Sequence, residues 1–147
     1  MVGIFPNRLL LSGERSVNRR EPWVSLAAGA LAKVHDRKRI SRDTLRRIND
    51  APVVCISAIT SFEVGIKYRS GKLKLPVPPP QWMAGIMEHH GLAAIDVTTD
   101  ICLKASELPP IHGDPCDRFI IATALLQNAS VVTADKRFDQ YGVEVLI

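Results

Sequence analysis

The sequence has few cysteines and no long apolar run, and these absences exclude several classes of protein. Its three cysteines are an odd number without a CxxC spacing, which argues against a disulfide framework and a zinc ribbon and fits a reducing cytoplasm. No apolar stretch approaches the ~20 residues that a membrane-spanning helix needs, so we expect no membrane association. Hydrophobic residues make up 46% and charged residues 23% of the 147 residues, which excludes disorder and fibrous repeats.

Several well-known catalytic and nucleotide-binding motifs are also missing. The stretch from Gly65 to Gly71 and Lys72 has five intervening residues and no following Ser or Thr, so it is not a P-loop. Neither a G-x-S-x-G elbow nor a G-x-G-x-x-G fingerprint occurs. His89 and His90 are adjacent and diverge by about 100° on a helix, so they cannot both face one ion.

Positive charge is concentrated at the N-terminal end. Residues 1–50 hold 11 Lys and Arg against 5 Asp and Glu, whereas residues 51–147 hold 8 against 10. A basic segment attracts phosphate backbones or acidic protein surfaces, and a solvated basic face without a partner is equally consistent with it. Residues 24–32 superficially resemble an export signal, but they are mostly Ala and Gly and lie far from the N-terminus, where a signal has only a short basic region. A cytoplasmic protein is therefore expected, and a short helix is another interpretation of this stretch.

Strands and helices alternate after residue 40. Ser41 is a suitable N-cap for a helix that ends near Pro52, and apolar runs predict strands at 53–56, 92–97, 130–133 and 143–146. Helices are expected at 58–70, 81–90, 99–108 and 115–128, with a helical turn at 136–140. This alternation predicts an α/β fold with a mainly parallel sheet. We expect one domain over residues 39–147, preceded by an atypical basic segment over residues 1–38.

Three acids lie near junctions where sites form in such folds, at the carboxyl edge of the sheet. Asp117 begins the helix at 115–128 and shares its apolar face, while Asp114 suits the N-cap of that helix. Glu63 lies in the helix at 58–70, bracketed by Ile59, Phe62 and Ile66 on what we expect to be a packing face. Asp135 directly follows Val131-Val132-Thr133-Ala134, at the end of the strand at 130–133.

Each acid also has a purely structural explanation. Glu63 can pair with Lys67 at i,i+4, Asp117 can serve only the helix start, and Asp135 can cap the following turn. Together, however, three converging carboxylates repel one another unless a cation joins them. Oxygen ligands suit Mg²⁺ or Mn²⁺, and such an ion activates water and neutralises the charge that develops on a phosphodiester. His112 lies in the loop before Asp114. An approach to the site is one interpretation of this position, and a solvated loop position is expected for it.

Three segments resemble the signatures of PIN-domain proteins, and more narrowly of VapC-type ribonuclease toxins from bacterial toxin–antitoxin pairs. These segments are Ser57-Ala58-Ile59-Thr60-Ser61-Phe62-Glu63 with its continuation to Leu73, Asp114-Pro115-Cys116-Asp117-Arg118-Phe119, and Val131-Val132-Thr133-Ala134-Asp135 with its continuation to Val143. They occur in the family's order and cover residues 40–147.

The resemblance implies a three-layer α/β/α sandwich and a Mg²⁺-dependent endoribonuclease, with Mn²⁺ as a possible substitute. It also implies an RNA substrate, a cognate antitoxin protein as partner, and usually a homodimer. By position, Glu63, Asp117 and Asp135 correspond to three of the family's four metal-binding and catalytic acids. Arg118, Lys67 and the basic N-terminal third are candidates for holding the RNA backbone.

The family's first acid has no clear counterpart. Residues 8–11 look like the family's first strand, but Ser12 and Gly13 stand where Asp and Thr are expected. The stretch at 24–31 fits the spacing to Glu63 better and contains no acid, and Glu14 and Asp36 are substitutes in poor register. Either this carboxylate has been lost, or the segment reflects a shifted reading frame or a misplaced start. Loss predicts weak or absent cleavage with the fold retained. An unrelated phosphatase-like hydrolase is disfavoured because no nucleophilic Asp follows a first strand.

Overall fold

The computed structural model describes residues 23–26 and 40–147, and these residues build one parallel sheet. The strands are β1 (Trp23–Leu26), β2 (Val54–Ser57), β3 (Ala93–Ile95), β4 (Ala129–Val132) and β5 (Val145–Leu146). Their order is β3-β2-β1-β4-β5, and every adjacent pair is parallel. The predicted α/β fold with a parallel sheet is therefore confirmed.

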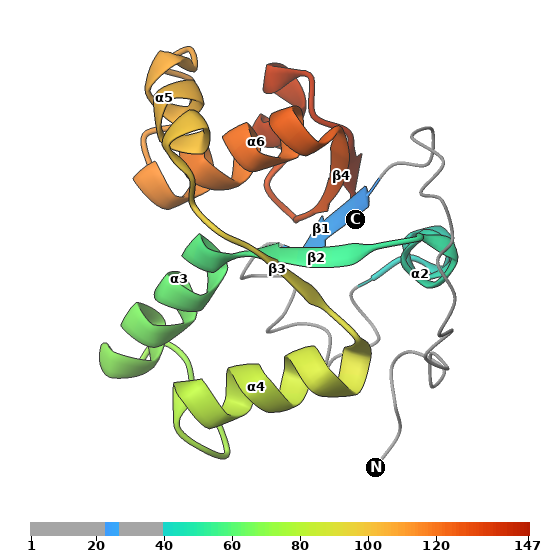
Figure 1. The fold of residues 1–147 in the computed structure, drawn as a ribbon, viewed down its shortest axis with the longest axis vertical. Coiled ribbons are helices and arrows are strands. Elements are labelled where there is room, and N and C mark those ends of the chain that lie inside the picture. The colour runs from blue at the N-terminus through green and yellow to red at the C-terminus, as the bar shows by residue number, and fades with distance from the viewer. Residues whose placement is uncertain (1–22, 27–39) are drawn as a thin grey trace.

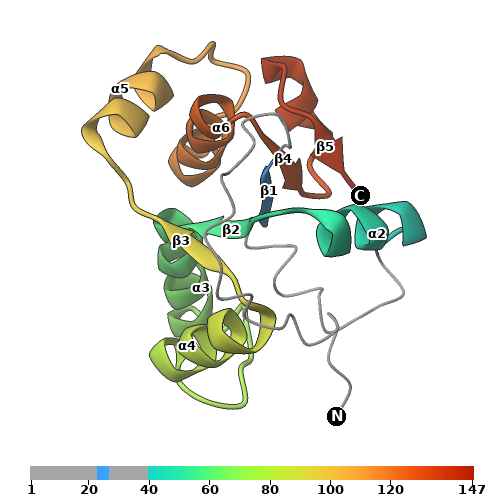
Figure 2. The same cartoon turned by 45° about the vertical axis from the view of Figure 1, so that its right-hand side comes forward.

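Helices cover both faces of the sheet. They are α2 (Arg42–Asp50), α3 (Ala58–Arg69), α4 (Pro79–His90), α5 (Thr99–Glu107) and α6 (Pro115–Gln127), and a short 3₁₀ helix spans Lys136–Tyr141. Figure 1 shows α3 and α4 on one side of the sheet and α5 and α6 on the other, while Figure 2 shows α2 beside the C-terminus. The architecture is the expected three-layer sandwich. None of the helices in the described part of the chain has the length and apolarity that crossing a bilayer requires.

Two apolar cores, one on each face, hold the layers together. The strands β2 and β4 are buried along their whole length, as expected for strands covered on both faces. On one face Val64 of α3 and Trp82 of α4 pack with Ile56, and on the other Ile120 and Ile121 of α6 pack with Phe138 and other apolar residues. Because α6 lies against the sheet through these isoleucines, its N-terminal turn is fixed at the sheet edge.

Local capping explains where the helices begin and end. The hydroxyl oxygen of Ser41 accepts a hydrogen bond from the backbone N–H of Thr44 at 3.1 Å, and Thr98 caps α5 in the same manner. The chain leaves α3 through Gly71, whose φ of +72° lies in the left-handed region that favours glycine. These boundaries were foreseeable because each one carries a cap residue of the expected type.

The central strand β1 occupies residues 23–26, between β2 and β4. This part of the stretch at 24–32 is therefore a strand rather than a helix, and it supports the later of the two positions considered for the family's first strand. The other candidate strand, residues 8–11, lies outside the described residues, as do Ser12, Glu14 and Asp36. β1 belongs to the same sheet as the rest of the domain although it precedes residue 39, and the boundary at 38/39 stays a prediction.

Candidate metal centre

Asp117 lies in the first turn of α6, at the carboxyl edge of the sheet. Asp114 caps this helix by accepting a hydrogen bond from the backbone N–H of Cys116 at 2.8 Å, and Pro115 occupies the first helical position. The Asp117 side chain is 23% exposed. It is therefore largely withdrawn from water but open on one side.

Asp135 approaches the same edge from the end of β4. Its carboxylate caps the 3₁₀ helix by accepting from the backbone N–H of Arg137 at 3.0 Å. The Arg137 guanidinium also donates to both carboxylate oxygens, with Nε 3.0 Å from Oδ1 and Nη2 2.5 Å from Oδ2. These hydrogen bonds from Arg137 hold the pKa of Asp135 well below its usual range.

His112 joins the two aspartates. Its Nε2 lies 3.1 Å from Oδ2 of Asp117 and 2.9 Å from Oδ2 of Asp135. One ligand atom from each of the three side chains lies within 4.8 Å of the others. The structure thus brings together residues from the α5–α6 loop, from α6 and from the segment after β4.

The expectation that His112 is a solvated loop residue is wrong, because only 2% of it is exposed. Its ring packs edge-to-face against Phe138, with 5.8 Å between the ring centres. A loop position with neighbouring prolines gives no apolar periodicity, so burial could not be inferred from the local pattern. The available signal was its position five residues before Asp117.

Glu63 lies near Asp117, but it is outside the group formed by His112, Asp117 and Asp135. Its side chain is 13% exposed, and its Oε1 lies 3.4 Å from Nζ of Lys67, so the i,i+4 pair is present. The neighbouring Phe62 and Ile66 are 57% and 49% exposed. The expectation that they mark a packing face is wrong, because α3 instead buries Thr60 and Val64.

The pKa of Asp117 is shifted in the opposite direction from that of Asp135. Burial raises the pKa of the Asp117 carboxyl to about 6, and His112 opposes this rise. The negative charges of Asp114, Glu63 and Asp135 raise it further. Negative charge is therefore incompletely neutralised around Asp117. A divalent cation would relieve it, and a set of carboxylate oxygens suits Mg²⁺ or Mn²⁺.

Arg118 is occupied within the protein. Its Nη1 donates to the carbonyl oxygens of Pro109 and His112, and its Nη2 donates to those of Ala105 and Leu108, at 2.6–3.3 Å. These four contacts fix the loop between α5 and α6. A role of Arg118 toward RNA stays a prediction, and it would require some of these bonds to be exchanged.

β1 supplies no carboxylate, since its four residues are Trp, Val, Ser and Leu. The next acid along the sequence is Asp36, which lies outside the described residues. Within the described residues, the acids at this edge therefore come from α3, α6 and the segment after β4.

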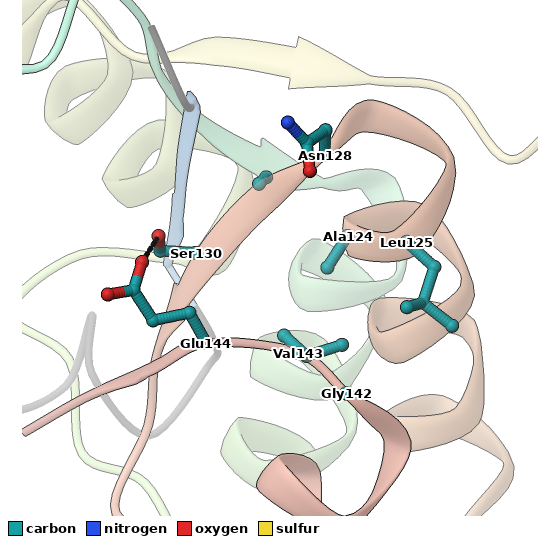
Figure 3. A pocket seen from close by; sticks show the side chains of 8 residues that line it. Ala124, Leu125, Asn128, Ser130, Gly142, Val143 and Glu144 are labelled. Carbon is teal, nitrogen blue, oxygen red and sulfur yellow. Dashed lines mark hydrogen bonds between the residues drawn. The ribbon is translucent and has the colours of Figure 1, made fainter.

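A pocket at the other end of β4 contains none of these acids (Figure 3). There Ser130 donates a hydrogen bond to Glu144 at 2.5 Å, and both oxygens of Glu144 accept from Arg47 of α2 at 2.7 Å. These bonds from Arg47 and Ser130 lower the pKa of Glu144 to about 2. This carboxylate is fully satisfied within the protein and offers no comparable cation site.

The parallel sheet, its helical layers and the carboxylates at its edge define a small α/β domain of known type. Residues 27–144 match the PIN domain, so the chain belongs to the PIN-domain family. Among individual relatives, Ribonuclease VapC22 of Mycobacterium tuberculosis is 30% identical over 101 residues, covering 68% of this chain and 76% of the relative. The predicted resemblance to PIN-domain proteins, and to VapC-type proteins among them, is confirmed.

Solved structures show the same fold at low sequence identity. VapBC from Salmonella typhimurium bound to DNA superposes with a TM-score of 0.62 at 20% identity, and VapBC2 from Rickettsia felis bound to a promoter DNA fragment with 0.59 at 17%. VapBC-1 from nontypeable Haemophilus influenzae gives 0.59 at 18%. Each alignment covers 84% of this chain and 96% of the other.

Proposed function

We propose that this chain is a Mg²⁺-dependent endoribonuclease toxin of a toxin–antitoxin pair. The observation that carries the proposal is the convergence of Asp117 and Asp135 around His112, with the pKa of Asp117 raised to about 6. Membership of the PIN-domain family and the similarity to a VapC ribonuclease support it. Mn²⁺ is expected to substitute for Mg²⁺, because both ions favour carboxylate oxygens.

Asp117 and Asp135 would hold the ion, and Glu63 would assist directly or through water. When bound, the ion would activate water and neutralise charge on the RNA phosphodiester. Lys67 is 45% exposed beside Glu63, which suits it to contact a phosphate of the substrate. The basic residues of the N-terminal third would add attraction for the RNA backbone.

We expect the protein to act in the cytoplasm, as a homodimer that a cognate antitoxin neutralises. The support is the structural similarity to VapBC proteins, two of which are described as bound to DNA. Co-expression with the product of an adjacent antitoxin gene, followed by size-exclusion chromatography with light scattering, tests both expectations. A free monomer under these conditions would contradict them.

A second function is favoured by one specific observation, the lack of an acid in β1. Removing one ligand of a hard-cation site lowers both its charge and its coordination, so Mg²⁺ would bind weakly and water would be poorly placed. In this alternative the chain is a catalytically degenerate PIN domain that still binds antitoxin or RNA. Ala27→Asp, which adds a carboxylate directly after β1 in the sequence, is then expected to increase cleavage.

The deciding experiment incubates the purified full chain with RNA, with and without Mg²⁺. Cleavage that requires Mg²⁺ and disappears in Asp117→Asn supports the toxin ribonuclease. Absence of cleavage together with retained antitoxin or RNA binding supports the degenerate domain. Cleavage that persists in both EDTA and Asp117→Asn would contradict the proposed site.

A further inference from the structure

We propose that His112 is a positioning residue, which holds the carboxylates of Asp117 and Asp135 together by donating its Nε2–H to both. This inference rests on the proposed function of that pair as the metal-binding carboxylates. Nε2 lies within hydrogen-bond distance of one oxygen from each aspartate, at 3.1 and 2.9 Å. The same imidazole atom therefore serves two residues from different elements of the fold.

The other ring nitrogen indicates which tautomer is present. Nδ1 of His112 lies 3.3 Å from the backbone N–H of Asp114, which donates to it. Nδ1 must therefore carry a lone pair, and the proton of the neutral ring is on Nε2. A protonated Nε2 has no lone pair for a metal ion, so His112 acts on the carboxylates rather than as a ligand of the ion.

The ring is held from several directions, which fixes where its proton points. The backbone N–H of His112 donates to the hydroxyl oxygen of Tyr141 at 2.7 Å, and that hydroxyl donates to the carbonyl of Pro109 at 2.9 Å. The carbonyl of His112 accepts from Arg118, and Phe138 packs against the ring. A buried imidazole with its backbone fixed on both sides is well suited to orient other groups.

The two aspartates come from different elements, so a donor that contacts both carboxylates links them directly. Asp117 projects from α6, whereas Asp135 follows β4, and two carboxylates at this separation repel each other. Arg137 contacts only Asp135 among them. His112 is the donor that contacts both carboxylates among the described residues.

The test compares Mn²⁺ affinity, measured by isothermal titration calorimetry, among three variants and the natural chain. In His112→Ala both carboxylates lose their shared donor, and affinity is expected to fall by about 10-fold or more, as for other residues that orient metal ligands. His112→Gln keeps an N–H donor at a similar reach and is expected to restore most of that affinity. His89→Ala is the matched control, since His89 is exposed on α4, and it should bind as the natural chain does.

Two results would overturn the inference. One is His112→Ala binding Mn²⁺ as tightly as the natural chain, and the other is a folded His112→Gln binding as weakly as His112→Ala. If His112→Ala does not fold, the comparison of His112→Gln with the natural chain decides. Melting temperatures recorded without metal show which variants are folded.

A separate spectroscopic measurement distinguishes failure of this inference from failure of the proposed function. If the natural chain binds no Mn²⁺ and cleaves no RNA, the proposed function is wrong because its metal does not bind. ¹⁵N NMR of histidine-labelled protein then decides the role of His112. A neutral ring with the proton on Nε2 supports the shared donor, whereas a proton on Nδ1 instead would overturn it.

Discussion

Glu144, at the amino end of β4, and Asp117, at its carboxyl end, are carboxylates whose pKa values are shifted in opposite directions. At the amino end Glu144 accepts hydrogen bonds from Arg47 and Ser130, and its pKa is lowered to about 2. At the carboxyl end Asp117 is partly buried beside other acids, and its pKa is raised to about 6. Both ends are acidic, yet Glu144 is paired with an arginine, whereas Asp117 has a histidine and three further acids around it.

This difference shows how a structural carboxylate can be told from one that is prepared for a ligand. Arg47 and Glu144 connect α2 to the start of β5, and Thr44 also binds the carbonyl of Ile147, so this end fastens the C-terminus to α2. A folded protein does not retain uncompensated negative charge without some cost in stability. The charge around Asp117 is therefore in line with the proposed metal centre.

The largest effect is expected from Arg118→Ala, which removes the support of the loop at the carboxyl end. Four carbonyls, of Ala105, Leu108, Pro109 and His112, would lose their guanidinium donor. Leaving partly buried acceptors unpaired should lower the free energy of unfolding by about 2–4 kcal/mol. Urea denaturation measures this, with exposed Arg42→Ala on α2 as control. A loss no greater than the control's would show that Arg118 does not fix the loop.

Glu144→Gln is expected to lower the free energy of unfolding by about 1 kcal/mol at neutral pH, because charge-assisted hydrogen bonds to Arg47 are lost and solvent screens a side chain that is 54% exposed. The lowered pKa means that the stabilisation is complete above the ordinary Glu pKa of 4.5 and is lost as the pH falls toward 2. Natural and variant stabilities should therefore converge in acid. A difference that is the same at neutral and acidic pH would contradict this origin.

Asp117→Asn is expected to stabilise the metal-free protein at pH 7.5. A raised pKa means that the natural chain loses stability as the pH rises from the ordinary Asp pKa of 3.8 through about 6. Allowing for partial solvent exposure, the gain should be on the order of 1 kcal/mol. Thermal unfolding at pH 4 and 7.5 measures it. An equal effect at both values would show that ionisation of Asp117 is not its cause.

Ser130→Ala should give the smallest change, about 0.5–1 kcal/mol of destabilisation, because Glu144 keeps its contacts to Arg47. Ser130 is buried, and its hydroxyl donates to Glu144. The pKa of Glu144 is expected to rise in this variant, which NMR titration of the carboxyl carbon can follow. An unchanged pKa of Glu144 would show that the hydrogen bond from Ser130 does not lower it.

Most of the fold was predictable because its boundaries depend on local chemistry. Ser41, Thr98 and Asp114 cap helices as expected, and the apolar runs of β2 and β4 predict strands buried on both faces. The position of β1 was less certain, because residues 8–11 have a stronger apolar pattern than residues 23–26. Its place in the centre of the sheet depends on pairing with β2 and β4, which are distant in sequence.

The candidate site was only partly predictable, because it also depends on contacts between residues that are distant in sequence. Asp117 and Asp135 follow from the rule that sites form at the carboxyl edge of a parallel sheet. The burial of His112 was not predicted because it depends on Phe138 and Tyr141, which follow β4 in the sequence. The exposure of Phe62 also depends on which face of α3 meets α4, and the local spacing does not specify that.

The most direct test of the account is the change in melting temperature on adding Mn²⁺ to the metal-free chain at pH 7.5. Because an ion that binds only the folded state stabilises it, the account predicts a rise for the natural chain. It predicts the same rise for Glu144→Gln, whose change lies at the other end of β4, and no rise for Asp117→Asn. An unchanged melting temperature in the natural chain, or an equal rise in Asp117→Asn, would contradict the assignment of the metal centre to the carboxyl end.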